Sequence, residues 1–288
     1  MRFSIGFLVL LVPISVLNPP AFGQGSGELI AFSNPESLAS RTPILIAHRG
    51  GVITATVPEC SLAAIRLAGQ DGYDMVELDI QATKDNLAVV FHDRNLEEDA
   101  GKKGRVSDYD RDELIQWPLL GTEEKIPTLE QALSLCREIG LGVMLDFKTE
   151  GAENYYRHVH DAIRDAGLHE STITITSRKA IREFFMIDLK SPIWFRVLDG
   201  DDPLSKGRYA FDRASAFDRE RIEELHSQGL LAIPALNTFH YPPETNLRDA
   251  ARDAERLLEL GVDGFQIDSV YQHFFGLPRR PLPGFEGE

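Results

Sequence analysis

Two histidines stand at the ends of short apolar segments, where a purely structural strand would remain apolar. His48 follows the run 44–47, and His92 follows the run 87–91. A histidine side chain can take up or release a proton near neutral pH, so two of them facing one reacting centre would form an acid–base pair. The alternative for each histidine alone is a core or surface group with satisfied hydrogen bonds.

A third apolar segment carries two acidic residues with one residue between them, Glu77 and Asp79. Alternate residues of a strand point to the same face, so these two carboxylates point together. Close carboxylates repel each other unless a cation lies between them, which predicts a divalent-metal site. The alternative is an edge strand whose polar face meets water. The strongly apolar neighbouring segments favour an internal strand.

Three more charged residues extend this pattern. Asp146 closes the segment 142–147 and can offer a third carboxylate to the cation, while Lys148 can meet a phosphate or neutralise the carboxylates. Taken alone, a buried Asp–Lys ion pair is the better explanation of these two. Glu59 follows a proline at the start of a helical segment and is either a first-turn acid or a metal ligand; the residue alone favours the first.

The remaining candidates are two aspartates and the other histidines. Asp263 and Asp268 flank a segment that resembles a last strand, and each is as likely to be structural as functional. A structural interpretation covers the other histidines, which are His158, His160, His169, His226, His240 and His273.

These residues require elements that position them, and the sequence alternates strand-like and helix-like segments almost throughout, which is typical of a parallel sheet covered by helices. The predicted strands are 44–47, 75–80, 87–91, 142–147, 172–176, 193–198, 230–235 and 264–267. The predicted helices are 61–69, 128–140, 152–166, 178–189, 219–228 and 247–260. Thr128 and Gln131 are spaced as a capping box, and we expect Gly140 to end that helix in a left-handed conformation.

One region breaks the alternation. Between Asp93 and Pro127 the sequence is charged and contains glycines, with one short helix expected around 108–117. Long loops of a barrel usually lie at the carboxyl ends of the strands and line the active site. Residues 24–40 and the proline- and glycine-rich tail 278–288 are expected to be peripheral.

The N-terminus has the plan of a secretory signal: Arg2, an uncharged apolar stretch over 5–16, and small residues around Gly23. A membrane anchor is the alternative, but the apolar run is shorter than the roughly 20 residues that a span needs. We expect residues 1–23 to be a signal peptide, 24–40 an extension and 41–288 one barrel domain. The protein is therefore expected to be exported, to a periplasm or outside the cell.

The acidic composition bears on which partners the protein can bind. The formal net charge of −15 disfavours nucleic acid and anionic membrane surfaces. A small-molecule substrate is expected, with no stable membrane anchor, and no protein partner is predicted. Two cysteines do not make a disulfide framework. We expect Cys60 and Cys136 to be free.

Taken together and in order, the motifs resemble those of the glycerophosphodiester phosphodiesterase family, within the phosphatidylinositol-phospholipase-C-like superfamily. The resemblance runs from about 44 to 268 and rests on the segments His48-Arg49-Gly50, Pro58-Glu59, Glu77-Leu78-Asp79, Phe91-His92-Asp93, Ile126-Pro127-Thr128-Leu129-Glu130, Asp146-Phe147-Lys148 and Gly261-Val262-Asp263-Gly264.

The resemblance implies an α/β fold, the (β/α)₈ TIM-type barrel, with a short inserted region after the second strand. It implies that His48 and His92 are the acid–base pair and that Arg49 and Lys148 bind the substrate phosphate. One divalent cation, Mg²⁺ or Ca²⁺, would be held by Glu59, Glu77, Asp79 and Asp146. The implied reaction is attack of a glycerol hydroxyl on phosphorus, release of the alcohol, and opening of the cyclic phosphate by water to give glycerol 3-phosphate.

Four departures from the family pattern leave the alcohol open. The loop before Glu59 is two residues longer, Cys60-Ser61 replaces Asn-Thr, and Asp146 replaces a glutamate. The family's Trp-Thr-Val-Asn segment is here Pro234-Ala235-Leu236-Asn237. The alternatives are a phospholipase D acting on lysophospholipid or sphingomyelin, whose spider-toxin relatives also use aspartate in place of that glutamate, and a barrel with unrelated carboxylate–metal chemistry, such as a lyase. A further alternative is a non-catalytic barrel that binds a phosphate ligand.

Overall fold

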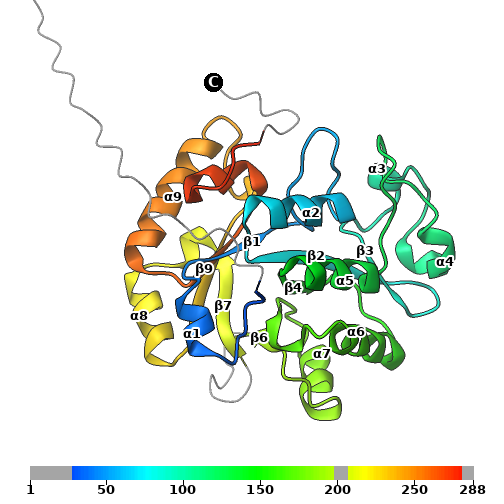
Figure 1. Cartoon of the computed structure of the whole chain (residues 1–288), viewed down its shortest axis with the longest axis horizontal. Coiled ribbons are helices and arrows are strands. Elements are labelled where there is room, and N and C mark those ends of the chain that lie inside the picture. The colour runs from blue at the N-terminus through cyan, green and yellow to red at the C-terminus, as the bar shows by residue number, and fades with distance from the viewer. Residues whose placement is uncertain (1–27, 198–206, 281–288) are drawn as a thin grey trace, which may run out of the picture.

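The apolar segments of the sequence form the wall of a closed barrel in the computed structural model, which describes residues 28–197 and 207–280 (Figure 1). Its eight parallel strands are β1 (Ile44–Ala47), β2 (Met75–Ala82), β4 (Gly142–Phe147), β5 (Thr172–Thr174), β6 (Trp194–Arg196), β7 (Gly207–Arg213), β8 (Leu231–Leu236) and β9 (Gly264–Ile267). The barrel closes because β1 pairs with both β2 and β9. The predicted (β/α)₈ fold is confirmed.

Two strand predictions were wrong. The segment 87–91 was placed among the parallel strands, but β3 (Ala88–Val90) pairs with β2 in the antiparallel direction. A tight turn joins them, with Asn86 at φ +59°, and such a turn leaves no room for the crossover that parallel strands need. The eighth barrel strand is β7, which the sequence analysis did not identify.

The described α-helices are α1 (Pro35–Ala39), α2 (Leu62–Asp71), α3 (Glu97–Ala100), α4 (Arg111–Leu114), α5 (Leu129–Ile139), α6 (Glu153–Asp165), α7 (Lys179–Glu183), α8 (Arg219–Ser227) and α9 (Asn246–Leu260). Most of them cover the outside of the barrel, whereas α3 and α4 belong to the region inserted after β2 (Figure 1). A π-helical turn, Phe184–Asp188, continues α7, and a 3-10 helix, Ser269–Phe275, follows β9. None of the described helices combines the length and apolar character that a membrane span requires.

The predicted ends of α5 are confirmed. Thr128 accepts a hydrogen bond from the backbone N–H of Gln131, and the Gln131 side chain accepts one from the backbone N–H of Thr128. This capping box satisfies two N–H groups that the first turn leaves without a partner. Gly140 ends the helix at φ +79°, in the left-handed region.

The segment before the barrel is less peripheral than expected. Ile30 and Phe32 are fully buried and pack in a core cluster with Ile44, Met75 and other side chains from the amino ends of the strands. Their apolar side chains therefore help to fill the barrel from that end. The predicted signal peptide, residues 1–23, lies outside the described residues.

The inserted region lies after β2 as predicted and includes β3, α3 and α4. It projects beside the barrel at the right of Figure 1, away from β8 and β9. It has a small apolar core of its own, which includes Leu96, Val106, Leu114 and Ile126. Val89 of β3 and Phe91, which follows it, belong to the same core, so β3 and the helices of the inserted region pack together.

Strand register brings the polar residues together at that end. Asp79 pairs with Asp146 across β2 and β4. Ala47 pairs with Val76 on one side and with Ile267 on the other. The next residue of each strand therefore continues the row, so His48 stands beside both Glu77 and Asp268.

Candidate active site

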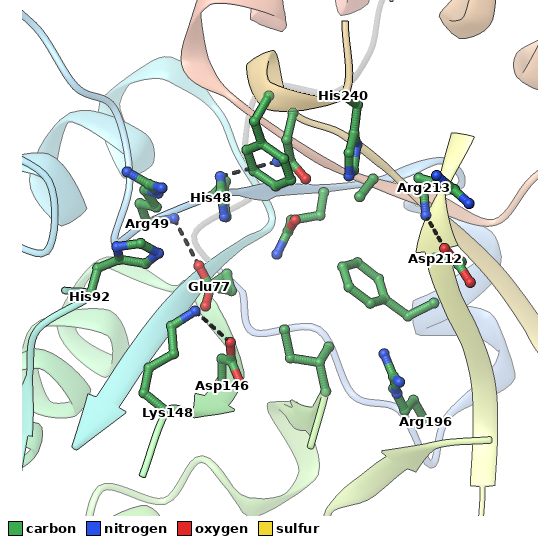
Figure 2. A pocket seen from close by; sticks show the side chains of 16 residues that line it. His48, Arg49, Glu77, His92, Asp146, Lys148, Arg196, Asp212, Arg213 and His240 are labelled. Carbon is green, nitrogen blue, oxygen red and sulfur yellow. Dashed lines mark hydrogen bonds and ion pairs between the residues drawn. The ribbon is translucent and has the colours of Figure 1, made fainter. Parts of the chain in front are cut away.

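A cavity of about 570 Å³ opens at the carboxyl ends of the strands (Figure 2). Six sequence-predicted residues line it, namely His48, Arg49, Glu77, His92, Asp146 and Lys148. The opposite wall comes from β5 to β8 and includes Arg196, Arg213, Phe211 and Asn237. His240, which the sequence analysis treated as structural, also lines the cavity.

Three carboxylates converge on one wall of the cavity. Oxygen atoms of Glu77, Asp79 and Asp146 lie within 4.8 Å of one another, and the first two side chains are fully buried. Burial and the charge of Asp79 raise the pKa of Glu77 well above its ordinary value. Burial also acts to raise the pKa of Asp79, but the positive charge of Lys148 and the histidines outweighs it and holds that pKa low. The raised pKa of Glu77 indicates that the three clustered carboxylates carry more negative charge than the nearby cationic side chains neutralise.

Lys148 supplies part of that charge. Its Nζ lies 2.9 Å from Asp79 Oδ1 and 2.8 Å from Asp146 Oδ2. Asp79 Oδ1 is buried, and the Lys148 ammonium is the charged group that meets it. A hard divalent cation takes such carboxylate oxygens as ligands. The residues present therefore fit a bound divalent cation.

His48 is oriented by a residue that sequence reasoning left out. Its Nδ1 lies 2.6 Å from Asp268 Oδ1 and 3.1 Å from Asn237 Nδ2. The backbone N–H of Thr238 donates to the other Asp268 oxygen at 2.6 Å. Burial acts to raise the pKa of Asp268, but the His48 and Thr238 contacts lower it to about 2. Asp268 is therefore ionised and holds the His48 ring, a role that the sequence analysis left open.

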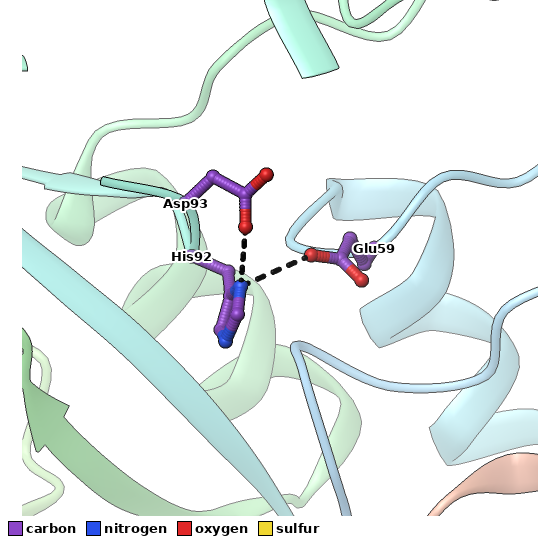
Figure 3. A group of neighbouring side chains, drawn as sticks. All are labelled: Glu59, His92 and Asp93. Atoms are coloured by element: carbon purple, nitrogen blue, oxygen red, sulfur yellow. Dashed lines mark hydrogen bonds and ion pairs between the residues drawn. The ribbon is translucent and has the colours of Figure 1, made fainter. Parts of the chain in front are cut away.

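His92 has a similar carboxylate partner, provided by its neighbour in sequence. Figure 3 shows His92 Nδ1 between Asp93 Oδ1 at 2.8 Å and Glu59 Oε1 at 3.6 Å. Each candidate histidine thus has one ring nitrogen against an acid, which leaves the other available to a reacting group.

Glu59, which the resemblance implies as a metal ligand, contacts Arg49 and lies near His92. Its Oε2 accepts a hydrogen bond from Arg49 Nη1 at 2.7 Å, and it groups with His92 and Asp93 rather than with the three clustered carboxylates. The neighbouring Asp99 of the insertion has its pKa raised to about 6 by burial, by Glu59 and by Asp93. Glu59 thus links Arg49 to His92 in this structure, and the clustered ligand set has three carboxylates.

The loop after β1 holds Arg49 through its backbone. The N–H of Arg49 donates to Glu77 Oε2 at 2.8 Å, and the N–H of Gly50 donates to the Glu77 carbonyl at 2.7 Å. Gly51 adopts φ +135°, and a Cβ there would lie 2.2 Å from the Ala64 carbonyl oxygen. Only glycine satisfies both conditions. The close approach of this loop to α2 therefore fixes the backbone on which Arg49 stands.

The Cys60 departure has a structural role. Cys60 lies at φ +55°, is buried, and its thiol donates to Asp79 Oδ2 at 3.6 Å. Burial and the neighbouring carboxylates raise the pKa of this thiol well above its ordinary value. Cys60 and Cys136 are both free, as predicted. The thiol thus takes a donor position beside the clustered carboxylates.

An aromatic side chain also lies close to the segment 234–237, which replaces the family's tryptophan-containing segment. Phe239 lines the cavity, its ring centroid is 6.2 Å from that of His48, and 65% of its surface is exposed. Phe211 of β7 lines the same cavity. The apolar part of the wall is therefore supplied from neighbouring positions.

Comparison with known proteins agrees with this geometry. Residues 48–271 match the model of the glycerophosphoryl diester phosphodiesterase family. A glycerophosphodiester phosphodiesterase from Bacillus altitudinis is 30% identical over 243 residues, which cover 78% of this chain and 94% of that protein. Glycerophosphodiester phosphodiesterase 1 from Mus musculus is 35% identical over 159 residues, or 49% of this chain. The match spans only 47% of the mouse protein's length.

Solved structures share the fold. A glycerophosphoryl diester phosphodiesterase from Parabacteroides distasonis superposes with a TM-score of 0.66 at 22% identity, covering 87% of this chain and 95% of that one. A phosphodiesterase from Oleispira antarctica, solved with the product sn-glycerol-3-phosphate, has a TM-score of 0.66 at 20% identity, covering 83% of this chain and 97% of that one.

Proposed function

Because the chain belongs to the glycerophosphoryl diester phosphodiesterase family, we propose that it hydrolyses glycerophosphodiesters to glycerol 3-phosphate and an alcohol. The observation that carries this proposal is the pairing of His48 with Asp268 and of His92 with Asp93 on a wall that also carries clustered carboxylates. The Oleispira relative, whose structure holds glycerol 3-phosphate as product, supports the same reaction. A non-catalytic barrel would not need two histidines oriented in this way.

The carboxylates Glu77, Asp79 and Asp146 would hold one divalent cation, Mg²⁺ or Ca²⁺. Such a cation neutralises phosphoryl charge and polarises a phosphoryl oxygen. The support is the convergence of the three carboxylates and the raised pKa of Glu77, a buried carboxylate beside Asp79. Glu59 is assigned instead to hold Arg49 and His92.

The phosphate would lie against Arg49 and Lys148. Both side chains line the cavity, and both have their pKa raised by neighbouring carboxylates although burial acts in the opposite direction. They therefore remain positively charged and can stabilise charge on the phosphoryl oxygens. Arg49 is held by Glu59 at one nitrogen, which limits its movement.

The two histidines would exchange protons with the substrate. One removes the proton from the glycerol 2-hydroxyl as its oxygen forms a bond to phosphorus, and the other donates a proton to the alcohol oxygen as its bond to phosphorus breaks. Water then attacks the resulting cyclic phosphate with the roles reversed, and breakage of the bond between phosphorus and the 2-oxygen gives glycerol 3-phosphate. Asp268 and Asp93 keep the two rings in place.

We further propose that residues 1–23 direct export, so that the barrel domain 41–288 works in a periplasm or outside the cell. The support is the sequence alone: one N-terminal charge, an apolar stretch and small residues before Gln24. N-terminal sequencing of the protein recovered from its native host tests this proposal. A mature chain that still begins at Met1 would contradict it.

The catalytic proposal is tested with EDTA-treated protein to which Mg²⁺ or Ca²⁺ is restored separately. Release of glycerol 3-phosphate from glycerophosphoethanolamine is measured for the wild type, His92→Ala and His226→Ala. His226 also contacts an aspartate, Asp263, but outside the cavity, so its variant is a matched control. We expect cation-dependent release that His92→Ala abolishes and His226→Ala retains. Release that persists in EDTA would contradict the metal assignment.

A further inference from the structure

A second cavity, of about 660 Å³, lies on the other side of His92 and Lys148. It is bounded by the end of β2, the inserted region and the loops after β4 and β5. Its lining residues are Gln81, His92, Asp93, Arg94, Arg105, Ser107, Lys148, Thr149, Glu150 and Arg178. His92 and Lys148 also line the first cavity, so the two spaces meet at the proposed phosphate position.

Hydrogen bonds hold the walls of this second cavity in place. The buried Gln81 side chain donates to the carbonyls of Phe91 and Asp93, both at 2.8 Å, and so fixes the loop that carries His92. On the opposite side, the Arg178 guanidinium donates to the carbonyls of Phe147 and Lys148. The cavity is therefore formed before any ligand binds.

Its lining is rich in arginine, although the chain as a whole has a net charge of −15. Arg178 is paired with Glu150 at 3.2 Å, and Asp93 is engaged by His92. Within residues 28–197 and 207–280, the guanidinium groups of Arg94 and Arg105 form no ion pair. Two arginines outside any ion pair thus line this cavity, and cations so placed attract an anionic group.

Displacement at phosphorus proceeds with the attacking and leaving oxygens roughly in line. Two substituents of a bound phosphodiester therefore extend in opposite directions from a phosphate at Lys148. The first cavity, which has Asn237 and Phe239 near His48 and carries Arg196 and Arg213 on its opposite wall, then receives the glycerol unit. The second cavity then receives the leaving alcohol, with His92 at the junction to protonate its oxygen.

We propose, resting on the function proposed above, that the second cavity binds the leaving alcohol and selects alcohols that carry an anionic group of their own, such as a phosphate monoester. Arg94 and Arg105 are the specificity-determining residues. Both belong to the segment between β3 and α4, so the inserted region sets the choice of substrate. A quaternary ammonium alcohol, with the opposite charge, is a poor fit to the same lining.

The test compares two substrates that differ by one phosphate, glycerophosphoinositol and glycerophosphoinositol 4-phosphate. Values of kcat/KM for glycerol 3-phosphate release are measured with the wild type, with the double variant Arg94→Gln/Arg105→Gln, and with Arg219→Gln as control. Arg219 is an exposed arginine of α8 that lines neither cavity. We expect the wild type to favour the phosphorylated substrate by about tenfold, the size that two solvated charge contacts allow.

In the double variant this ratio of the two kcat/KM values should fall to near one, and in Arg219→Gln it should stay at the wild-type value. Raising the ionic strength should reduce the wild-type ratio, since exposed charges are screened by salt. Turnover of both substrates with the same ratio in the wild type and the double variant would overturn the inference alone. Turnover of neither substrate, nor of glycerophosphoethanolamine, would overturn the proposed function as well.

Discussion

The contact between His48 and Asp268 allows a quantitative test of how the barrel orients a catalytic group. Asp268→Asn keeps the size of the side chain but removes the charge 2.6 Å from His48 Nδ1. The pKa of Asp268 is about 2, against an ordinary value of 3.8. Each unit corresponds to about 1.4 kcal/mol, so the contacts favour the ionised form by about 2 kcal/mol. Loss of that stabilisation predicts a ten- to fiftyfold lower kcat/KM, where about 1.4 kcal/mol is tenfold.

The assay is glycerol 3-phosphate release across the pH range, with Asp263→Asn as the matched control. Asp263 also pairs with a histidine, His226, at 2.9 Å, but at the other end of β9. A positioning role predicts that Asp268→Asn lowers kcat and changes its pH dependence, whereas Asp263→Asn leaves both near the wild-type values. The binding of substrate, seen in KM, should change little, because Asp268 does not line the cavity.

The same contact has a signature in stability. The folded-state pKa of Asp268 lies below the ordinary value, so its stabilising contribution is present above about pH 4 and is lost as the pH falls toward 2. The free energy of unfolding of the wild type and of Asp268→Asn should therefore converge as the pH falls from about 4 to about 2. An Asp268→Asn protein with wild-type kcat, an unchanged pH profile and no such convergence would refute the reasoning.

Three further substitutions probe the surroundings of the site. Gly51→Ala should lower the free energy of unfolding by about 1 to 3 kcal/mol, because residue 51 has a positive φ and the new Cβ would lie 2.2 Å from the Ala64 carbonyl oxygen. An unchanged midpoint of urea unfolding would contradict this close approach. Cys60→Asn should keep the fold and most of the activity, because asparagine tolerates φ +55° and can donate a hydrogen bond to Asp79. The β-branched variant Cys60→Val should lower the melting temperature by several degrees, and equal melting temperatures of the two variants would count against this reasoning. Addition of Mg²⁺ or Ca²⁺ should raise the melting temperature of the wild type but not of Asp146→Asn, because a cation that binds only the folded state stabilises it; a similar rise in both proteins would show that the ion binds elsewhere.

Local patterns in the sequence were sufficient for the parts of the fold that local physics controls. Alternation of apolar and helical segments predicted a parallel sheet covered by helices, the family resemblance implied its closure into a barrel, and the residue types around Thr128 and Gly140 predicted both ends of α5. The antiparallel strand β3 was missed although its signal was present. Only the short stretch 83–87 separates it from β2, too few residues for a crossover to a parallel neighbour. Strand β7 was missed because Gly207–Arg213 carries charges at both ends and only three apolar residues between them.

Site residues that directly follow a strand could be predicted from the sequence. Contacts between residues that meet only because the barrel closes were not predicted. His48 and Asp268 are 220 positions apart. They become neighbours because β1 and β9, the first and last strands, pair with Ala47 opposite Ile267. That consequence of a (β/α)₈ barrel was available once the fold was inferred. The partner of Glu59 was not, because the path of the loop between Gly51 and α2 decides it.

The central claim, that this wall of side chains cleaves a glycerophosphodiester on the alcohol side of phosphorus, is tested most directly by ³¹P nuclear magnetic resonance. Glycerophosphoethanolamine is incubated with the EDTA-treated protein, with and without restored Mg²⁺ or Ca²⁺, and with His48→Ala and His92→Ala. The account predicts glycerol 3-phosphate as the final phosphorus product, only with a cation and only with both histidines. Phosphoethanolamine as the product, or turnover that survives loss of either histidine, would contradict it.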